Sequence, residues 1–368
     1  MPQPVRAFHI VGDQSTELDA LPEALPPNGY LWIAAAQPAF EAALPDVQAR
    51  LQAWTAAQLF DLHVLDLLNK QLPSSYDYTS AYDILVFRRL AASASATIDN
   101  DGNPAEGRQD AINLIDTSPV GFVVFDRVLL TVHPSDCQVR EFFAARLKSQ
   151  TSSTAEGRVS ARMPTSPADL MLRMVNHMVD SYLELRRVLA KQLDDLQEQL
   201  FGERGGPDGW RLLLDSRNAL HLLEDTCEDQ RAAITEWIDA LDEWPAASDE
   251  AQRREREQLR VRSRDVLEHI ERVIAHVRRL EGSAESAVQM HFSALGNRTN
   301  DIMRTLTALT AIFLPLNLIA GIFGMNFELL PLTHQAAGFW WTVGAMGVIA
   351  VLLGVVFWRK RYLARTGR

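Results

Sequence analysis

The sequence predicts an α+β domain, then a long helical stalk, and finally two C-terminal transmembrane helices. Strand-like and helix-like runs alternate through residues 6–134, and a helical period replaces them from residue 168 onward. Two apolar runs, 306–323 and 339–358, contain no Asp, Glu, Lys or Arg. Each run is close to the ~20 residues that a helix needs to cross the hydrocarbon core of a bilayer. Residues 324–338 are a short link, so the two spans are expected to form a hairpin.

The N-terminal part has the pattern of a mixed domain. Short runs rich in β-branched and aromatic residues predict strands at 7–10, 30–34, 82–88, 121–125 and 128–132. Asp126 and Arg127 separate the last two runs, which predicts a β-hairpin. Helices are expected over 38–51 and 55–69. Residues 91–109 are rich in Ala, Ser, Asn, Asp and Gly, and are expected to form a loop.

The helical part begins after a segment rich in Ser, Thr and Gly at residues 149–166, which we expect to be a linker. A helix is predicted over 168–201 and a second over 209–244, each ended by a Gly- or Pro-containing break. Ser248 or Asp249 is placed to cap the next helix. No proline follows until Pro315, so this helix is expected to continue into the first apolar run, over about 75 residues at ~1.5 Å each.

These signals divide the chain into seven segments. They are an α/β domain at 1–148, a linker with antiparallel helices at 149–248, a stalk helix at 249–305, a first transmembrane helix at 306–323, a loop at 324–338, a second transmembrane helix at 339–358, and a basic tail at 359–368.

Charge predicts the orientation in the membrane. The net charge is −11, yet residues 359–368 contain five Arg or Lys residues and the hairpin loop one acid, which leaves −15 on the remainder. A basic tail after a span indicates a cytoplasmic C-terminus, and two spans return the N-terminal body to the same side. No signal peptide is visible at Met1. Cys137 and Cys227 have no Cys-x-x-Cys spacing, which fits a reducing compartment.

The acidic excess disfavours nucleic acid as a partner and suits a body that meets cations, although ordinary solubilising charge has the same appearance. The acidic run at 224–229 is open to the same two interpretations. Because the stalk helix lacks a local partner near the membrane, we expect self-association there.

Polar and small residues form a stripe on the first apolar run. Its members are Asn300, Met303, Thr307, Thr310, Leu314, Asn317, Gly321 and Gly324, at alternating steps of three and four residues. An amide in lipid is costly unless it faces a partner or water. The stripe is therefore either a dry helix–helix contact or, in an oligomer, the lining of a shared channel. Rings of oxygen atoms would suit Mg²⁺, which keeps several of its waters when bound.

Three stretches resemble the CorA family of divalent cation channels, whose superfamily also contains the zinc transporter ZntB. They are Asn-Arg-Thr-Asn-Asp-Ile-Met-Arg at 297–304, Ile-Phe-Leu-Pro-Leu at 312–316, and Ile-Ala-Gly-Ile-Phe-Gly-Met-Asn-Phe at 319–327. The Gly-Met-Asn tripeptide alone is a weak signal. At the outer end of the first of two C-terminal spans it is specific. The order of domains resembles the family over nearly the full length.

The resemblance implies a funnel-shaped homopentamer in which the first span lines the pore and the second surrounds it. Gly324, Met325 and Asn326 would form the selectivity filter at the periplasmic entrance, beside a loop that carries Glu328 and His334. Family pore positions fall on Asn300, Met303, Leu306, Thr310, Leu314, Asn317 and Gly321, and the stripe adds Thr307. Met303 and Leu314 are candidates for a hydrophobic gate. A helix C-cap is the plainer interpretation of Asn326.

The resemblance also implies a cytoplasmic sensor, in which Mg²⁺ bridges acids of neighbouring subunits. The matching stretch is Arg264-Asp265-Val266-Leu267-Glu268-His269, so the metal role is carried to Asp265, with Glu268 nearby. The alternative to a metal ligand is that Asp265 is a solvated carboxylate on the stalk, near Arg262 or Arg264. The partner acid in the α/β domain is not identified by the sequence. His269 follows Asp265 by four residues and is either a second ligand or a surface residue.

Three departures from the family pattern bear on the ion. Phe323 stands where Tyr is common, Asn317 replaces a Thr, and Leu332 follows Pro331 where relatives usually have a second acid. The loop thus contains only two charged or titratable residues, Glu328 and His334. We therefore expect the channel entrance to attract cations less strongly than the entrance of relatives with two acids.

The leading functional hypothesis is a Mg²⁺ channel, also permeable to Co²⁺ and Ni²⁺, in a bacterial-type inner membrane and gated by cytoplasmic Mg²⁺. A ZntB-like Zn²⁺ transporter, with or without proton coupling, is the alternative. A membrane-tethered sensor or scaffold without conduction is a third class. An enzyme is disfavoured because Walker, Rossmann and His-Glu-x-x-His motifs are lacking in the sequence. The expected partners are identical subunits, lipid and the cation itself. The cation is expected to be both the transported ion and the regulatory ligand. We expect no tightly bound cofactor and no nucleic acid.

Overall fold

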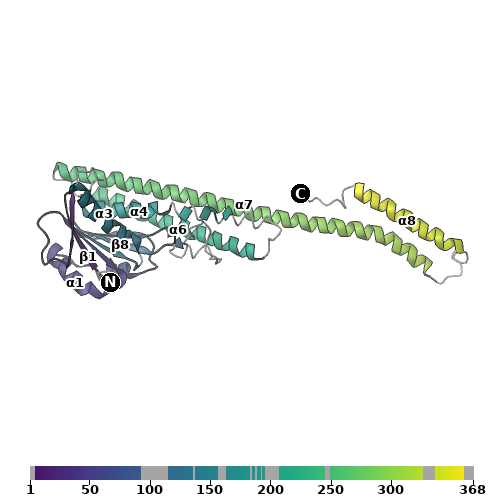
Figure 1. Cartoon of the computed structure of the whole chain (residues 1–368), viewed down its shortest axis with the longest axis horizontal. Helices are drawn as coiled ribbons and strands as arrows, with labels where there is room; N and C mark the ends of the chain where they lie inside the picture. Colours follow the sequence, from purple (N-terminus) through teal and green to yellow (C-terminus); the bar gives the residue numbers. More distant parts are fainter. Residues whose placement is uncertain are drawn as a thin grey trace. The chain divides into compact units, whose positions relative to one another are not determined.

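The structure is a computed structural model and contains two compact units, Met1–Ala284 and Glu285–Arg368. It describes residues 5–92, 115–135, 137–155, 163–182, 185–186, 189–191, 193–194, 207–244, 249–325 and 336–359. One helix, α7 at Glu250–Phe323, has residues in both units (Figure 1).

A seven-stranded sheet forms the centre of the first unit, in the order β2-β1-β3-β9-β8-β5-β4. The strands are β1 Val5–Val11, β2 Gln14–Leu18, β3 Tyr30–Ala36, β4 Ser75–Tyr78, β5 Asp83–Arg88, β8 Pro119–Val124 and β9 Val128–His133. β3 and β9 pair in parallel, and the other neighbours are antiparallel. β8 and β9 are buried along their whole length, because both faces of the sheet are covered.

Alternate residues of the central strands enter two separate cores, as the period of a strand requires. Leu31 and Ile33 of β3 pack with residues of α1 (Gln37–Thr55) and α2 (Asp61–Leu68). Trp32, between them, packs on the other face with residues of α4 (Pro167–Asp180), α6 (Pro207–Glu243) and α7. Figure 1 shows helices on both sides of the sheet.

A buried hydrogen bond ties α6 to α7. The indole Nε1 of Trp237 donates to Oγ of Ser263 at 2.9 Å, and both side chains are buried. At the start of α7 the carboxylate of Asp249 accepts from the backbone N–H of Gln252 at 2.7 Å. This is the geometry of an N-cap, so the predicted cap at Asp249 is confirmed.

The five expected strands are confirmed, as is the hairpin that joins β8 to β9. Its turn is closed by the N–H of Phe125, which donates to the carbonyl of Val128 at 2.9 Å. The expected helices 38–51 and 209–244 correspond to α1 and α6, and the long continuous helix corresponds to α7, with Pro315 inside it. Of the helix expected over 168–201, residues 168–180 lie in α4.

Three expectations were wrong in part. Residues 55–69 do not form one helix: α1 extends to Thr55, Ala56 adopts a left-handed φ of 57°, and α2 begins at Asp61. Residues 149–155, expected in a linker, belong to α3 (Gln138–Ala155). In the expected loop at 91–109, Ala91–Ala92 form the short strand β6, which pairs with β7 at Ile115–Asp116. The strands β2 and β4 and the helix α3 were not predicted.

The second unit contains the end of α7 and the helix α8 at Ala336–Arg359. Both helices include a stretch long and apolar enough to cross a membrane. Large apolar side chains on both helices are exposed in the single chain, among them Phe313, Leu318, Trp341 and Val351. Such an exposed apolar surface is what a spanning helix presents to lipid or to other spans.

Candidate functional site

The predicted pore stripe lies on an exposed face of α7. The eight residues predicted to line the pore are all exposed in the single chain: Asn300, Met303, Leu306, Thr307, Thr310, Leu314, Asn317 and Gly321. A different face of the same helix is covered: Ala308 is buried, and Ile312, Leu316 and Ile319 are half-buried. In the described part of the second unit, α8 is the other helix, and Figure 1 shows the chain reversing its direction between α7 and α8. The stripe is therefore left available for contacts outside the chain.

Threonine hydroxyls on the stripe direct their protons into their own helix. Oγ1 of Thr307 donates to the carbonyl of Met303 at 2.7 Å, and Oγ1 of Thr310 donates to that of Leu306 at 2.9 Å. The lone pairs of each hydroxyl oxygen remain as acceptors on the exposed face. Asn317 adds an amide to the same face. This face thus offers oxygen atoms, the ligand type that hard, hydrated cations prefer.

Helix α7, which is predicted to line the pore, ends just before the predicted filter. The N–H of Gly324 donates to the carbonyl of Ala320 at 2.9 Å, and the N–H of Met325 donates to that of Ile322 at 3.3 Å. A Cβ atom on Gly324 would lie 3.1 Å from the Ala320 carbonyl oxygen, which is tighter than an ordinary contact, so glycine suits this end. Three predicted residues, Asn326, Glu328 and His334, lie outside the described residues.

The two predicted sensor acids have different neighbours. The carboxylate of Glu268 accepts from Arg272 at 3.2 Å, within the same helix. Asp265, whose side chain is 58% exposed, lies 3.9 Å from Nε2 of His269. Nδ1 of that imidazole lies 3.5 Å from the carboxylate of Asp180 on α4. The structure thus associates Asp265 with Asp180 through His269, and it gives Glu268 a separate partner.

Arginines surround the small cavity beside Asp265. This cavity of about 210 Å³ is bordered by Asp265, Asp180, Arg146, Arg173 and Arg262. The buried carboxylate of Asp169 forms ion pairs with two of them, at 3.0 Å from Arg173 and 2.6 Å from Arg262. Asp169 therefore offsets part of the positive charge. A cation at Asp265 would still be opposed by nearby guanidinium groups, so a further carboxylate from outside the chain would favour its binding.

Asp180 was missed by sequence reasoning because its neighbour His269 is distant along the chain. The one local signal is its place in the last turn of an apolar-spaced helix, which many solvated acids share. His177 lines the same cavity, and burial lowers its pKa, with Asp180 acting in the opposite direction and Arg146 in the same direction. A neutral imidazole at His177 adds no further positive charge to the cavity.

Comparisons with known proteins agree on one family. The family model described as CorA-like Mg²⁺ transporter protein matches residues 53–361. The cobalt/magnesium transport protein CorA of Thermotoga maritima is 37% identical over 100 residues, which are 27% of this chain and 28% of the relative. The magnesium transport protein CorA of Haemophilus influenzae is 23% identical over 256 residues, 69% of this chain and 75% of the relative. A zinc transport protein ZntB of Yersinia pseudotuberculosis is 27% identical over 198 residues, 54% of this chain and 56% of the relative.

The alignment with the Thermotoga protein therefore spans little more than a quarter of that relative's length. Among solved structures, the complete CorA magnesium transporter of Methanocaldococcus jannaschii superposes with a TM-score of 0.72 at 18% identity, covering 100% of this chain and 99% of that one. This similarity confirms the predicted fold class, an α+β domain followed by a long helix and two C-terminal apolar helices.

Proposed function

The chain belongs to the CorA-like Mg²⁺ transporter family, and we propose on this basis that it conducts divalent metal cations across a membrane. The observation that supports this most directly is the exposed stripe of Thr307, Thr310 and Asn317 on α7, which leads to the Gly-Met-Asn tripeptide. A stripe of acceptors beside lipid would be unfavourable, whereas the same stripe around a shared aqueous channel is satisfied by water and cations.

The proposed assembly is a homopentamer in which each chain contributes α7 to the pore and α8 to an outer ring. Five copies of each stripe residue would form rings, and the ring of Asn326 would hold a cation through its waters, which Mg²⁺ gives up reluctantly. The N-terminal unit and the basic tail would lie in the cytoplasm of a bacterial-type inner membrane. A negative interior then draws each divalent ion inward with about 4.6 kcal/mol per 100 mV.

Gating is proposed to combine an apolar constriction with the cytoplasmic acids. Rings of Met303 and Leu314 would close the channel by expelling water. Mg²⁺ held by Asp265 and an acid of a neighbouring copy would favour that closed arrangement, because the cation offsets the repulsion between the two carboxylates. Two carboxylates are needed because the guanidinium groups near Asp265 weaken the attraction of a single carboxylate for the cation.

The proposed ion is Mg²⁺, with Co²⁺ and Ni²⁺ also permeating. The entrance loop supports a second candidate, Zn²⁺ transport with or without proton coupling, because it contains one acid, Glu328, together with His334. Imidazole nitrogen is a ligand that Zn²⁺ accepts and Mg²⁺ seldom uses.

Flux into proteoliposomes tests the proposal. The purified protein would be reconstituted, and uptake of Mg²⁺, Co²⁺, Ni²⁺ and Zn²⁺ measured with an inside-negative potential, with and without a pH gradient. Mg²⁺ uptake that follows the potential alone is expected. Zn²⁺ uptake that requires the pH gradient would favour the second candidate. Vesicles that admit none of the four ions faster than empty ones would contradict both.

A further inference from the structure

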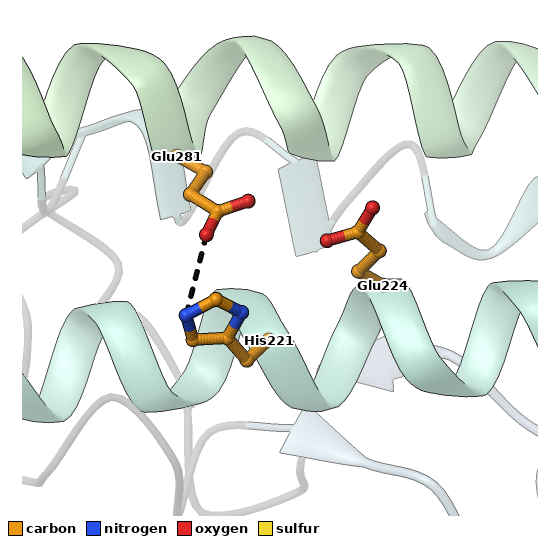
Figure 2. A group of neighbouring side chains, drawn as sticks. All are labelled: His221, Glu224 and Glu281. Atoms are coloured by element: carbon orange, nitrogen blue, oxygen red, sulfur yellow. Dashed lines mark ion pairs between the residues drawn. The ribbon is translucent and has the colours of Figure 1, made fainter.

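A histidine and two glutamates meet between α6 and α7 within the first unit, whereas the predicted pore residues belong to the second unit. His221 and Glu224 lie three residues apart on α6, so they share a face of that helix, and Glu281 faces them from α7 (Figure 2). One nitrogen or oxygen ligand atom from each residue lies within 4.8 Å of the other two. All three side chains are half-buried.

We propose that His221, Glu224 and Glu281 form a binding site for a divalent transition-metal cation of the Zn²⁺ class. Nε2 of His221 lies 3.2 Å from Oε1 of Glu281. Two ligands of a tetrahedral Zn²⁺ with bonds of about 2.0–2.1 Å are separated by about 3.3 Å, so this pair already has a suitable separation. Glu224 supplies the third ligand, and water the fourth.

Arg278 is a cation beside the proposed site, and its hydrogen bond orients the carboxylate of Glu224. Its Nε donates to Oε1 of Glu224 at 2.6 Å, and its Nη2 donates to Oε1 of Glu228 at 2.9 Å. Carboxylates that bind metals commonly accept a hydrogen bond from such an outer partner through one oxygen while the other faces the ion. Arg231 also forms an ion pair with Glu228. The three carboxylates and two guanidinium groups still leave a net negative charge, which favours a cation.

The donor set selects the class of metal. One imidazole nitrogen and two carboxylates suit Zn²⁺, Co²⁺ and Ni²⁺, whereas Mg²⁺ prefers an octahedron of oxygens. Cys227 lies next to the cluster but is buried, and burial, followed by the charges of Glu228 and Glu224, raises the pKa of its thiol to about 12. Without a bound metal, its sulfur therefore stays protonated.

The site joins two helices that also contact each other through apolar packing, ion pairs and the hydrogen bond from Trp237 to Ser263. A bound cation would cross-link α6 to α7, the helix whose last residues form the first candidate span. Binding does not depend on the proposed transport, so it can be measured in protein that conducts nothing.

Metal titration of the full-length protein in detergent tests the proposal. After treatment with a chelator, Co²⁺ would be added in the presence of millimolar Mg²⁺ to fill Mg²⁺ sites, and bound Co²⁺ counted from its visible absorption and by equilibrium dialysis. His221→Ala and Glu281→Gln should each lose one equivalent per chain, or weaken its affinity by at least about tenfold. Zn²⁺ should displace this equivalent, and further Mg²⁺ should not.

Controls separate metal binding from a purely structural ion pair. Glu271→Gln, at an exposed position of α7, and His291→Ala should retain the equivalent, and His221→Cys should restore a Zn²⁺ ligand at the same position. Circular dichroism and gel filtration would establish that each variant is folded and assembled. If His221→Ala and Glu281→Gln lower stability without metal yet bind as much Co²⁺ as the wild type with the same spectrum, the cluster is an ion pair and the proposal is wrong.

Discussion

At the scale of single residues, His133 is a buried imidazole whose pKa the fold lowers strongly. It is fully buried at the end of β9, with Nε2 at 2.8 Å from Oγ1 of Thr131 and Nδ1 at 3.5 Å from Sγ of Cys137. Burial lowers its pKa to about 3, and the positive charges of Arg140 and Arg89 act in the same direction. The folded chain therefore keeps this imidazole neutral where an unfolded chain would protonate it.

His133→Gln should reduce the acid sensitivity of the fold. Between pH 6.5 and about 3 the unfolded state binds a proton at His133 that the folded state does not, so stability falls as pH falls through this window. The slope from this one group is about 1.4 kcal/mol per pH unit. Denaturant midpoints of the solubilised protein, followed by tryptophan fluorescence from pH 7 to pH 3.5, should fall less steeply in the variant. Equal slopes would show that His133 is protonated in the fold.

Asn326→Ala should reduce Mg²⁺ uptake to that of empty vesicles. The proposed ring of amides holds the waters of the cation, and alanine has no polar atom to do so. Asn326→Gln, which keeps the amide at a greater distance from the backbone, should retain part of the flux. The measurement is uptake into proteoliposomes, with gel filtration to show that the variant assembles. Wild-type flux in Asn326→Ala would exclude the filter role.

At the scale of elements, the last part of α7 offers a matched pair of leucines. Leu314 and Leu309 are 65% and 52% exposed in the single chain, but Leu314 is on the predicted pore stripe and Leu309, five residues earlier, lies on a different face of the helix. Shortening the side chain at a constriction allows water to enter, whereas shortening one that faces lipid leaves the channel unchanged.

Leu314→Ala should therefore raise Mg²⁺ leak at high internal Mg²⁺, and Leu309→Ala should leave it at the wild-type level. Flux measured in vesicles preloaded with millimolar Mg²⁺ distinguishes the two. If both variants leak equally, or if Leu309→Ala alone leaks, the stripe does not face a channel and serves as a helix contact.

Elements also show which local signals are reliable. Asp126 and Arg127, between two apolar runs, predicted the β8–β9 hairpin, and Asp249 predicted the start of α7. Both predictions were possible because turns and caps depend on residues close in sequence. The edge strand β2, with sequence Gln-Ser-Thr-Glu-Leu, was missed because it gains its partner from β1 and lacks a buried apolar run. The end of α3 was missed because Ser and Thr favour loops when nothing packs against them.

At the scale of the whole molecule, the proposed sensor depends on copies of the chain. In one chain Asp265 is associated with His269, Asp180 and nearby arginines, an arrangement that offers a cation little net attraction. A pentamer would supply the additional carboxylate. Native mass spectrometry of the solubilised protein should accordingly show five chains.

Asp265→Lys should make closure less sensitive to cytoplasmic Mg²⁺. A lysine at this position repels the cation that is proposed to favour the closed state. Limited proteolysis across a Mg²⁺ series should show protection at higher Mg²⁺ in the variant than in the wild type, with Glu271→Lys, an exposed site on the same helix, as the control. Protection that does not depend on Mg²⁺ in the wild type would count against any Mg²⁺ sensor.

The sequence by itself determined the fold class, five of the strands, the two apolar helices and the stripe that leads to Gly324, because periodicity, charge and turn chemistry are local properties of the chain. The tertiary structure alone decided which distant side chains meet: Asp180 with His269, Trp237 with Ser263, and His221 with Glu281. These contacts join residues on different helices, and their spacing along the chain does not encode them. They follow from how buried apolar faces set the rotation of each helix against its neighbours.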